Sequence, residues 1–169
     1  MAGAPAVLNI NFVLDCLKQN KLLDPKDYSL LDKSGENSYH FKLVDAVKRA
    51  KVNQGHLLKG QTIFITPDIR GGTQTYRDII EVNGGRCTIF KGRSTSLAVA
   101  NQDDNETTGF LYLISGTSKS ETNLWPKFQE QAEAEGKKPR IVKTDWMLDI
   151  ALSQKIRWDP SYEAKINES

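Results

Sequence analysis

The stretch LLKGQTIFITPDIRGGTQTYRDIIEVNGGRCTIF, residues 57–90, decides the fold of this chain. Residues 62–66 are β-branched and aromatic, which indicates a buried strand. Residues 73–82 carry apolar side chains at helical spacing, and the following Asn-Gly-Gly supplies residues that tolerate the left-handed conformation in which helices end. Residues 86–90 indicate a second strand. Strand, helix and strand in this order predict a βαβ unit with a parallel sheet and a right-handed crossover.

The rest of the C-terminal half continues the same architecture. Residues 110–114, FLYLI, form an apolar run that is typical of a central strand covered on both faces. Residues 118–136 predict a helix in which Pro126 is tolerated only in the first turn or at a kink. Residues 140–142 predict a fourth short strand, followed by the helix DWMLDIALSQK. These elements predict an α/β domain with a four-stranded parallel sheet flanked by helices.

The N-terminal segment repeats the design of the last strand and helix. Residues 6–18, AVLNINFVLDCLK, predict a short strand followed by a helix whose N-cap is Asn11. The end of the chain follows the same plan, and Thr144 or Asp145 is the expected cap there. Both helices place an aromatic residue shortly before a Leu-Asp pair. We therefore interpret residues 1–24 as the last strand and helix of a preceding domain of the same kind.

Residues 25–56 are expected to link this fragment to the complete domain at residues 57–169. The linker contains a polar run, DKSGENS, and a helical segment, YHFKLVDAVKRAK. Phe41, Val44 and Val47 fall on one stripe of that segment. Because an apolar stripe left in water is unfavourable, we expect this helix to dock on its neighbour through the stripe.

Composition argues against several classes of protein. Lys and Arg number 23 against 21 Asp and Glu, so the formal charge of +2 gives no strong field for a nucleic-acid backbone. Cys16 and Cys87 lie far apart in apolar surroundings, which is typical of reduced, buried thiols in an intracellular protein. No apolar run approaches the roughly 18 residues needed to cross a bilayer. We expect a soluble protein.

Motifs for catalysis are missing from the sequence. It contains no GxxxxGK[ST] phosphate loop, no GxSxG nucleophile elbow and no HExxH metal motif. His40 and His56 are the only histidines, and both fall in the linker. The sequence therefore offers almost no residues from which a histidine triad or a histidine metal site could be built. We expect no enzyme activity, no cofactor and no metal.

Taken in order and spacing, these features resemble the BRCT family, and specifically the second half of a tandem BRCT pair. The matching features span residues 57–162 and are Leu58-Lys59-Gly60, the strand ending at Thr66, the Gly84-Gly85 pair, the apolar third strand, and Trp146 on the last helix. The linker and the ITPDI segment are most similar to the C-terminal pair of the PTIP type, including the fungal DNA-damage scaffolds of that group.

The resemblance implies a non-enzymatic, nuclear scaffold of the DNA-damage response. Tandem BRCT domains read phosphorylated protein tails, such as histone tails, at the cleft between two repeats. In such pairs the first repeat holds the phosphate, and those elements would precede Met1 here. This chain is therefore expected to supply the second-repeat side of the cleft.

On that side the resemblance implies a tail-binding cleft made of Arg70, Gly71, Thr144, Asp145 and Leu148. Arg70 is the main candidate, because a guanidinium can bind the carboxylate at the end of a tail with two parallel hydrogen bonds. The alternative is that Arg70 is an ordinary solvated turn residue.

Two further sets of residues follow from the resemblance. Thr66 and Lys119 would form a phosphate pocket in the second repeat, but Pro67 stands where the family has glycine and offers no N–H, so a degenerate pocket is expected. Packing between repeats would use Tyr76, Ile80 and Leu148. Without that packing we expect this patch to be exposed, residues 1–24 to be held loosely and the chain to self-associate.

Two alternative functions remain open at this stage. One is a DNA-binding BRCT domain of a repair enzyme, with Lys91 and Arg93 contacting a DNA end. The other is a repeat that only supports its neighbour and binds no ligand. Steep salt dependence of binding would favour the DNA reading, because counterions are released from the phosphate backbone.

Overall fold

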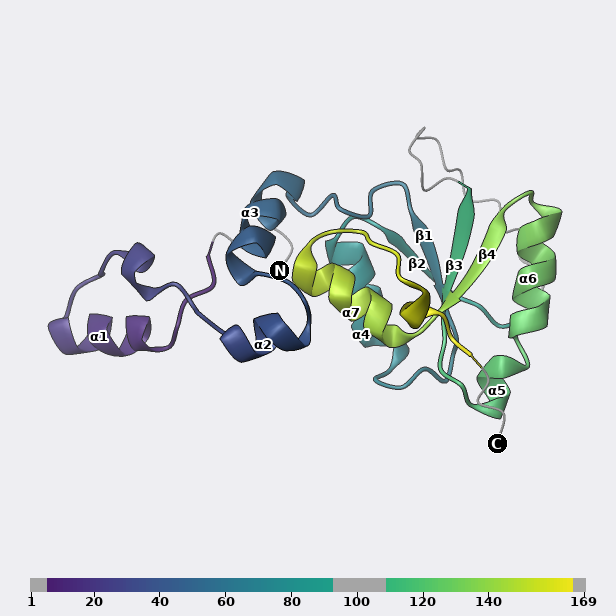
Figure 1. Ribbon diagram of the computed structural model, residues 1–169, viewed down its shortest axis with the longest axis horizontal. Coiled ribbons are helices and arrows are strands. Elements are labelled where there is room, and N and C mark those ends of the chain that lie inside the picture. The colour runs from purple at the N-terminus through teal and green to yellow at the C-terminus, as the bar shows by residue number, and fades with distance from the viewer. Residues whose placement is uncertain (1–5, 93–108, 166–169) are drawn as a thin grey trace.

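The computed structural model describes residues 6–92 and 109–165 (Figure 1). Its four strands form one sheet in the order β2-β1-β3-β4, and every neighbouring pair is parallel. The strands are β1 (Thr62–Ile65), β2 (Arg86–Ile89), β3 (Phe110–Ile114) and β4 (Lys138–Val142). The predicted parallel four-stranded sheet is confirmed, with β3 in its interior.

Strand β4 begins two residues before the predicted position and includes Pro139. Proline cannot donate to a strand ladder, so it is tolerated mainly on edge strands. Strand β4 is such an edge, because it pairs only with β3 along this part of its length. At its carboxyl end the segment after the last α-helix adds a single antiparallel bridge between Val142 and Glu163.

Helices cover both faces of the sheet. Helices α4 (Thr73–Val82) and α7 (Thr144–Ser153) lie on one face, and α6 (Trp125–Ala134) lies on the other (Figure 1). Ile63 and Ile65 of β1 pack in the core under α4 and α7, whereas Phe64 between them packs with Phe128 of α6. This alternation explains why all four residues of β1 are buried, as the apolar run predicted.

The predicted helix over residues 118–136 is divided into two. A short helix, α5 (Lys119–Thr122), precedes α6, and Pro126 lies in the first turn of α6, as predicted. The break orients Trp125, whose indole N–H donates to the Ser115 hydroxyl at 2.8 Å.

The linker helix α3 (Leu43–Asn53) docks on α7, but the predicted face is wrong. Its buried residues are Leu43, Ala46 and Ala50, whereas Val44 is 48% exposed. Two alanines allow close approach of the helices. The register is further held by Arg49, whose Nε donates to the Ser153 carbonyl oxygen at 2.8 Å.

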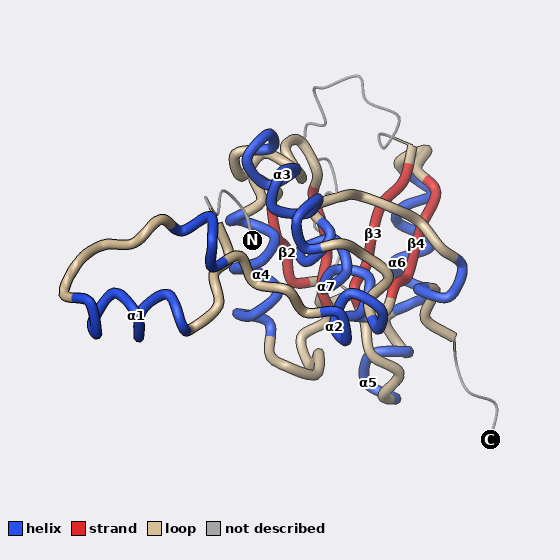
Figure 2. The backbone as a smooth tube through the Cα atoms, turned by 60° about the vertical axis from the view of Figure 1, so that its left-hand side comes forward, coloured by secondary structure: helices blue, strands red, loops and turns tan. Residues whose placement is uncertain are grey.

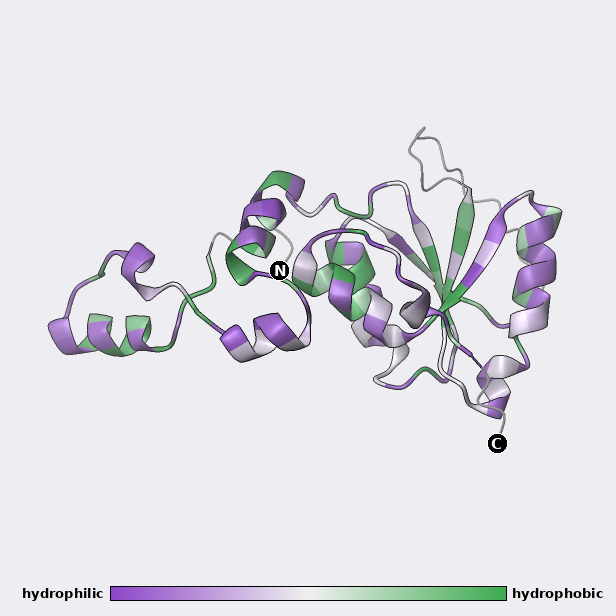
Figure 3. Ribbon diagram, viewed as in Figure 1, coloured by the Kyte–Doolittle hydropathy of each residue, from purple (hydrophilic) through white to green (hydrophobic). Residues whose placement is uncertain are grey.

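The N-terminal segment lies apart from the sheet. Helix α1 (Asn11–Gln19) and a short 3₁₀ turn, η1 (Pro25–Tyr28), contact each other, and in both views α1 projects away from the rest of the chain (Figures 1 and 2). The Tyr28 hydroxyl donates to Asp15 at 3.1 Å. No residue of α1 is buried, although its hydrophobic residues are visible in Figure 3. A second short helix, α2 (Lys33–Ser38), forms within the polar run of the linker.

Three local predictions were wrong. The expected strand near residue 8 is a single bridge between Leu8 and Ser29. Asn11 does not cap α1 but begins it, and its N–H donates to the side chain of Asn9 at 2.7 Å.

Neither Thr144 nor Asp145 caps α7. The N-cap residue is Lys143, without a side-chain cap bond. Both predicted residues lie inside the first turn, where the carboxylate of Asp145 is favoured by the helix dipole.

Candidate functional site

The loops that follow the carboxyl ends of the strands gather at one edge of the sheet (Figure 1). Because all four strands are parallel, residues 66–72 after β1, residues 115–118 after β3 and Lys143 after β4 meet there. Ligands of open parallel sheets usually bind outside this edge. We therefore take it as the candidate site.

The turn between β1 and α4 presents Arg70 to solvent on a fixed backbone. Gly71 and Gly72 have φ angles of +93° and +82°, which glycine adopts without strain. The Tyr76 hydroxyl donates to the carbonyl oxygen of Arg70 at 3.1 Å. The Thr75 hydroxyl donates to the carbonyl oxygen of Gly71 at 2.8 Å. Among the described residues the Arg70 guanidinium has no hydrogen-bond or ion-pair partner, so its donors are available.

The start of α7 contributes a second part of the predicted cleft. Asp145 is exposed, Thr144 is half-buried, and Leu148 is 39% exposed. Asp145 and Leu148 line one hollow of about 320 Å³, whose other walls are Ser38, Tyr39, His40, Asp149, Arg157, Ser161 and Tyr162. Arg70 and Gly71 do not line this hollow. The structure thus unites Asp145 with Leu148 and places the Arg70 turn elsewhere on the same edge.

Arg157 lines the hollow and was not singled out by the sequence analysis. Its Nε donates to Oδ2 of Asp149 at 2.7 Å, and Nη2 donates to the other carboxylate oxygen. Nη1 and Nη2 also reach the carbonyl oxygens of His40 and Tyr39, at 3.5 and 3.4 Å. The hydrogen bonds with Asp149 raise the pKa of Arg157 above its already high value. Arg157 therefore ties the linker to α7.

The signal for Arg157 lies in the last helix. Asp149 falls on the same apolar face as Trp146 and Ile150 and is only 6% exposed. A buried carboxylate requires a cation or several hydrogen-bond donors, so a nearby arginine is to be expected.

The expected degenerate phosphate pocket is filled by a carboxylate of the chain itself. Oε1 of Glu121 accepts from the Thr66 hydroxyl at 2.7 Å and from the Gly116 N–H at 2.8 Å. Oε2 accepts from the Ser118 hydroxyl at 2.7 Å and from its N–H at 3.3 Å. We call these four residues the Glu121 nest. Lys119 is exposed and has no bond to the nest.

Geometry and electrostatics both keep Glu121 in this position. A Cβ at Gly116 would lie 2.5 Å from Oε2 of Glu121, so glycine makes room for the carboxylate. Burial acts to raise the pKa of Glu121, which is 3% exposed, but hydrogen bonds from Thr66, Ser118 and the backbone outweigh it and lower the pKa. The carboxylate is thus ionised at neutral pH. The sequence signal is the capping box that Ser118 and Glu121 form at α5.

The patch expected for packing between repeats is largely inside the domain. Tyr76 and Ile80 are 6% and 0% exposed and belong to the core under α4 and α7. Only Leu148 of the three reaches the surface. Helical spacing had identified the apolar face of α4 correctly, but that face covers the chain's own sheet.

Other candidate groups contribute little at this edge. Lys91 is exposed after β2, and Arg93 lies outside the described residues. Burial raises the pKa of the Cys87 thiol to about 11, which makes it unreactive. Residues 6–92 and 109–165 contain no group of three or more side chains that could hold a metal ion. Across the same ranges, no helix has the length and apolar character needed to span a membrane.

Comparison of the sequence with known proteins finds related chains. BRCT-containing protein 1 of Schizosaccharomyces pombe is 25% identical over 154 residues, which is 90% of this chain and 17% of that protein. PAX-interacting protein 1 of Mus musculus is 30% identical over 109 residues, or 64% of this chain and 10% of that protein. The chain thus spans less than a fifth of the length of these relatives. No protein-family model matches it.

Solved structures share the fold. The BRCT5-BRCT6 domains of S. pombe Brc1 superpose with a TM-score of 0.66 at 22% identity, covering 97% of this chain and 73% of that one. Rtt107p, solved in complex with phosphorylated histone H2A, gives a TM-score of 0.61 at 16% identity, covering 95% and 65%. At such identities the similarity shows the shared fold alone.

Proposed function

Because this chain belongs to the BRCT domain family, we propose that it is a non-enzymatic interaction module of a nuclear DNA-damage-response scaffold. In this proposal it supplies the second-repeat side of a cleft that reads phosphorylated protein tails of the histone type. Residues 57–169 form a complete repeat, residues 1–24 are the end of a preceding repeat, and residues 25–56 link the two. The solved complex of Rtt107p with phosphorylated histone H2A supports this class of ligand.

The observation that carries the proposal is the exposed Arg70 guanidinium on its hydrogen-bonded turn at the carboxyl edge, which has no partner in the part of the chain that the structure describes. A tail ends in a planar carboxylate, which a free guanidinium binds through two parallel hydrogen bonds. Leu148 and Asp145 border the hollow at the start of α7 on the same edge, where a side chain of the tail can lie. In our assignment Arg70 and Gly71 bind the end of the tail.

The Glu121 nest supports a division of labour between repeats. Its donors already surround an ionised carboxylate, so a phosphate would have to displace Glu121 from four hydrogen bonds. We propose that this repeat recognises the tail carboxylate and that the phosphate is selected by the preceding repeat.

Binding of four versions of one tail peptide tests this assignment. The peptides are phosphorylated or not, and end in a free carboxylate or an amide. We expect the chain to prefer the free carboxylate about tenfold and to be nearly indifferent to the phosphate. Arg70→Ala should abolish the preference, whereas Arg86→Ala, an exposed arginine at the opposite edge of the sheet, should keep it. Equal binding of acid and amide peptides would contradict the proposal.

Salt dependence separates this function from DNA binding through Lys91 and its neighbours. Duplex DNA should bind weakly, and any binding should fall steeply between low and physiological salt. Tight, steeply salt-dependent DNA binding without any preference among the tail peptides would favour the DNA-binding alternative instead.

A further inference from the structure

The outer face of α3 carries an apolar stripe that the fold does not cover. Leu43, Ala46 and Ala50 are the buried residues of α3, whereas Val44 is 48% exposed and Val47 is half-buried. Arg49 and Asn53 fix the orientation by donating to the carbonyl oxygens at the end of α7. The helix therefore cannot turn its valines inward without losing these bonds.

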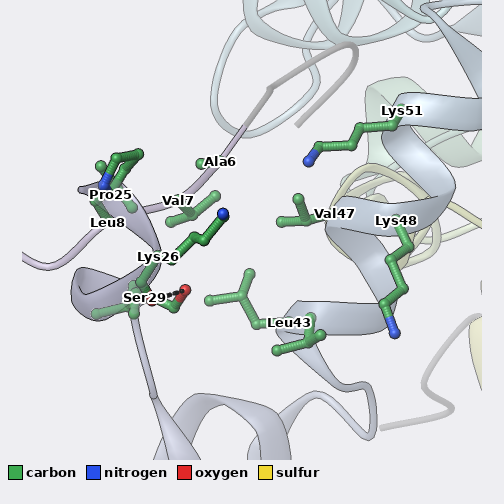
Figure 4. A pocket seen from close by; sticks show the side chains of 12 residues that line it. Ala6, Val7, Leu8, Pro25, Lys26, Ser29, Leu43, Val47, Lys48 and Lys51 are labelled. Carbon is green, nitrogen blue, oxygen red and sulfur yellow. Dashed lines mark hydrogen bonds between the residues drawn. The ribbon is translucent and has the colours of Figure 1, made fainter.

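A hollow of about 330 Å³ lies in front of this stripe, and we call it the α3 groove. Its far wall is the N-terminal segment, in which Leu30 N–H donates to the Val7 carbonyl oxygen at 3.0 Å and Leu8 pairs with Ser29. Val7 points toward Val47 across the gap (Figure 4). Hydrogen bonds thus hold both walls, through side chains in α3 and through the backbone in the N-terminal segment, and the floor between them is apolar.

The rim of the α3 groove is cationic. Lys26, Lys48 and Lys51 line it, and no Asp or Glu is among its lining residues (Figure 4). Lys26 lies 4.0 Å from Asp24, but both side chains are largely exposed, so this contact contributes little. Three like charges around an apolar floor are complementary to an anionic ligand that also carries apolar side chains.

We propose that the α3 groove binds an acidic segment of a protein partner, with large apolar side chains between Val7 and Val47 and carboxylates against the three lysines. A nucleic acid fits less well, because a phosphate backbone would leave the apolar floor uncovered. The volume is at the lower end of the range for ligand pockets, which suits one or two side chains. The groove is separate from the Arg70 turn, so this proposal is independent of tail binding.

The experiment uses a fluorescent peptide, Asp-Asp-Leu-Phe-Glu-Glu, and follows anisotropy as the whole chain is added. A second peptide has serine in place of leucine and phenylalanine and keeps the charge. We expect the first peptide to bind at least tenfold more tightly than the second, because only the first covers the floor.

Charge reversal then locates the site. The double variant Lys48→Glu with Lys51→Glu should weaken binding about tenfold. The matched control, Lys59→Glu with Lys127→Glu, makes the same change in net charge at exposed lysines that do not line the groove, and should bind like wild type. Val44→Ala, at a half-exposed position, tests the floor without endangering the fold, and should weaken binding about threefold.

Several outcomes would overturn the proposal. Equal losses in the two double variants would show bulk charge attraction, and equal binding of the two peptides would show that the floor is not used. Concentration-dependent self-association that Val44→Ala abolishes, without peptide binding, would make a second copy of the chain the occupant.

Discussion

The Glu121 nest and the Arg70 turn both lie at the carboxyl edge of the sheet, yet the donors of the nest are occupied by the chain's own carboxylate and the Arg70 guanidinium is exposed to solvent. In the nest, donors from Thr66 after β1 and from the loop after β3 already surround the chain's own carboxylate. In the turn, the Arg70 guanidinium stands on a hydrogen-bonded backbone and has no partner in residues 6–92 or 109–165. The difference indicates that one edge can use a buried charge for stability and keep another charge for a ligand. It also separates mutations that should affect folding from those that should affect binding.

Removing the carboxylate from the Glu121 nest should have the largest effect on the free energy of unfolding. Glu121→Ala removes the carboxylate that accepts hydrogen bonds from two hydroxyls and two N–H groups. Water can replace the carboxylate as acceptor for only some of these donors. We expect a loss of about 3 kcal/mol in the free energy of unfolding, measured with urea. Glu130→Ala, at an exposed position of α6, should change it by less than about 0.5 kcal/mol. A loss below that limit for Glu121→Ala would show that the nest is not a stabilising device.

Acidification should remove the difference in the free energy of unfolding between wild type and Glu121→Gln. The pKa of Glu121 is lowered in the folded chain from its ordinary value of 4.5. Its contribution is therefore complete above that value and is lost as the pH falls through the lower, folded pKa. Urea unfolding at a series of pH values should show a constant gap near neutrality that narrows below about pH 4.5. A gap that widens on acidification would contradict the assignment.

Arg157, in contrast to Arg70, donates hydrogen bonds to other residues of the chain. Arg157→Ala leaves Asp149 buried without its cation and frees the linker carbonyls of Tyr39 and His40. Because the Arg157 side chain is 35% exposed, we expect a loss of about 2 kcal/mol, less than for a fully buried pair. Amide exchange over residues 39–42 should also accelerate. A free energy of unfolding equal to that of Arg86→Ala would mean that the linker is held by α3 alone.

Arg70→Ala should have the smallest effect on folding. The side chain has no partner among the described residues, so the free energy of unfolding should change by less than about 0.5 kcal/mol. Binding of a tail peptide with a free carboxylate should nevertheless fall about tenfold. A marked loss of stability would show that Arg70 serves the fold, and its assignment to the ligand would then fail.

Local patterns were sufficient for the sheet but not for its charged contacts. The apolar runs and the Gly84-Gly85 pair predicted every strand and helix α4, because their periodicity is set by neighbours in the sequence. Glu121 depends on Thr66, 55 residues away, and no local pattern reports that contact.

The linker helix shows the same limit. Phe41, Val44 and Val47 formed the expected docking stripe, yet α3 turns its alanines inward. The face that docks is chosen by how closely α7 can approach and by carbonyl groups more than a hundred residues away, such as that of Ser153. The hydrophobicity pattern of a single helix does not show which face will dock.

Mapping a phosphorylated tail peptide on the chain by backbone amide chemical shifts tests the central claim most directly. The account predicts concentrated changes at residues 69–72 and beside Leu148, while the amides of Gly116 and Ser118 in the Glu121 nest stay unchanged with and without the phosphate. Phosphate-dependent shifts at Gly116 and Ser118, with residues 69–72 unaffected, would contradict it.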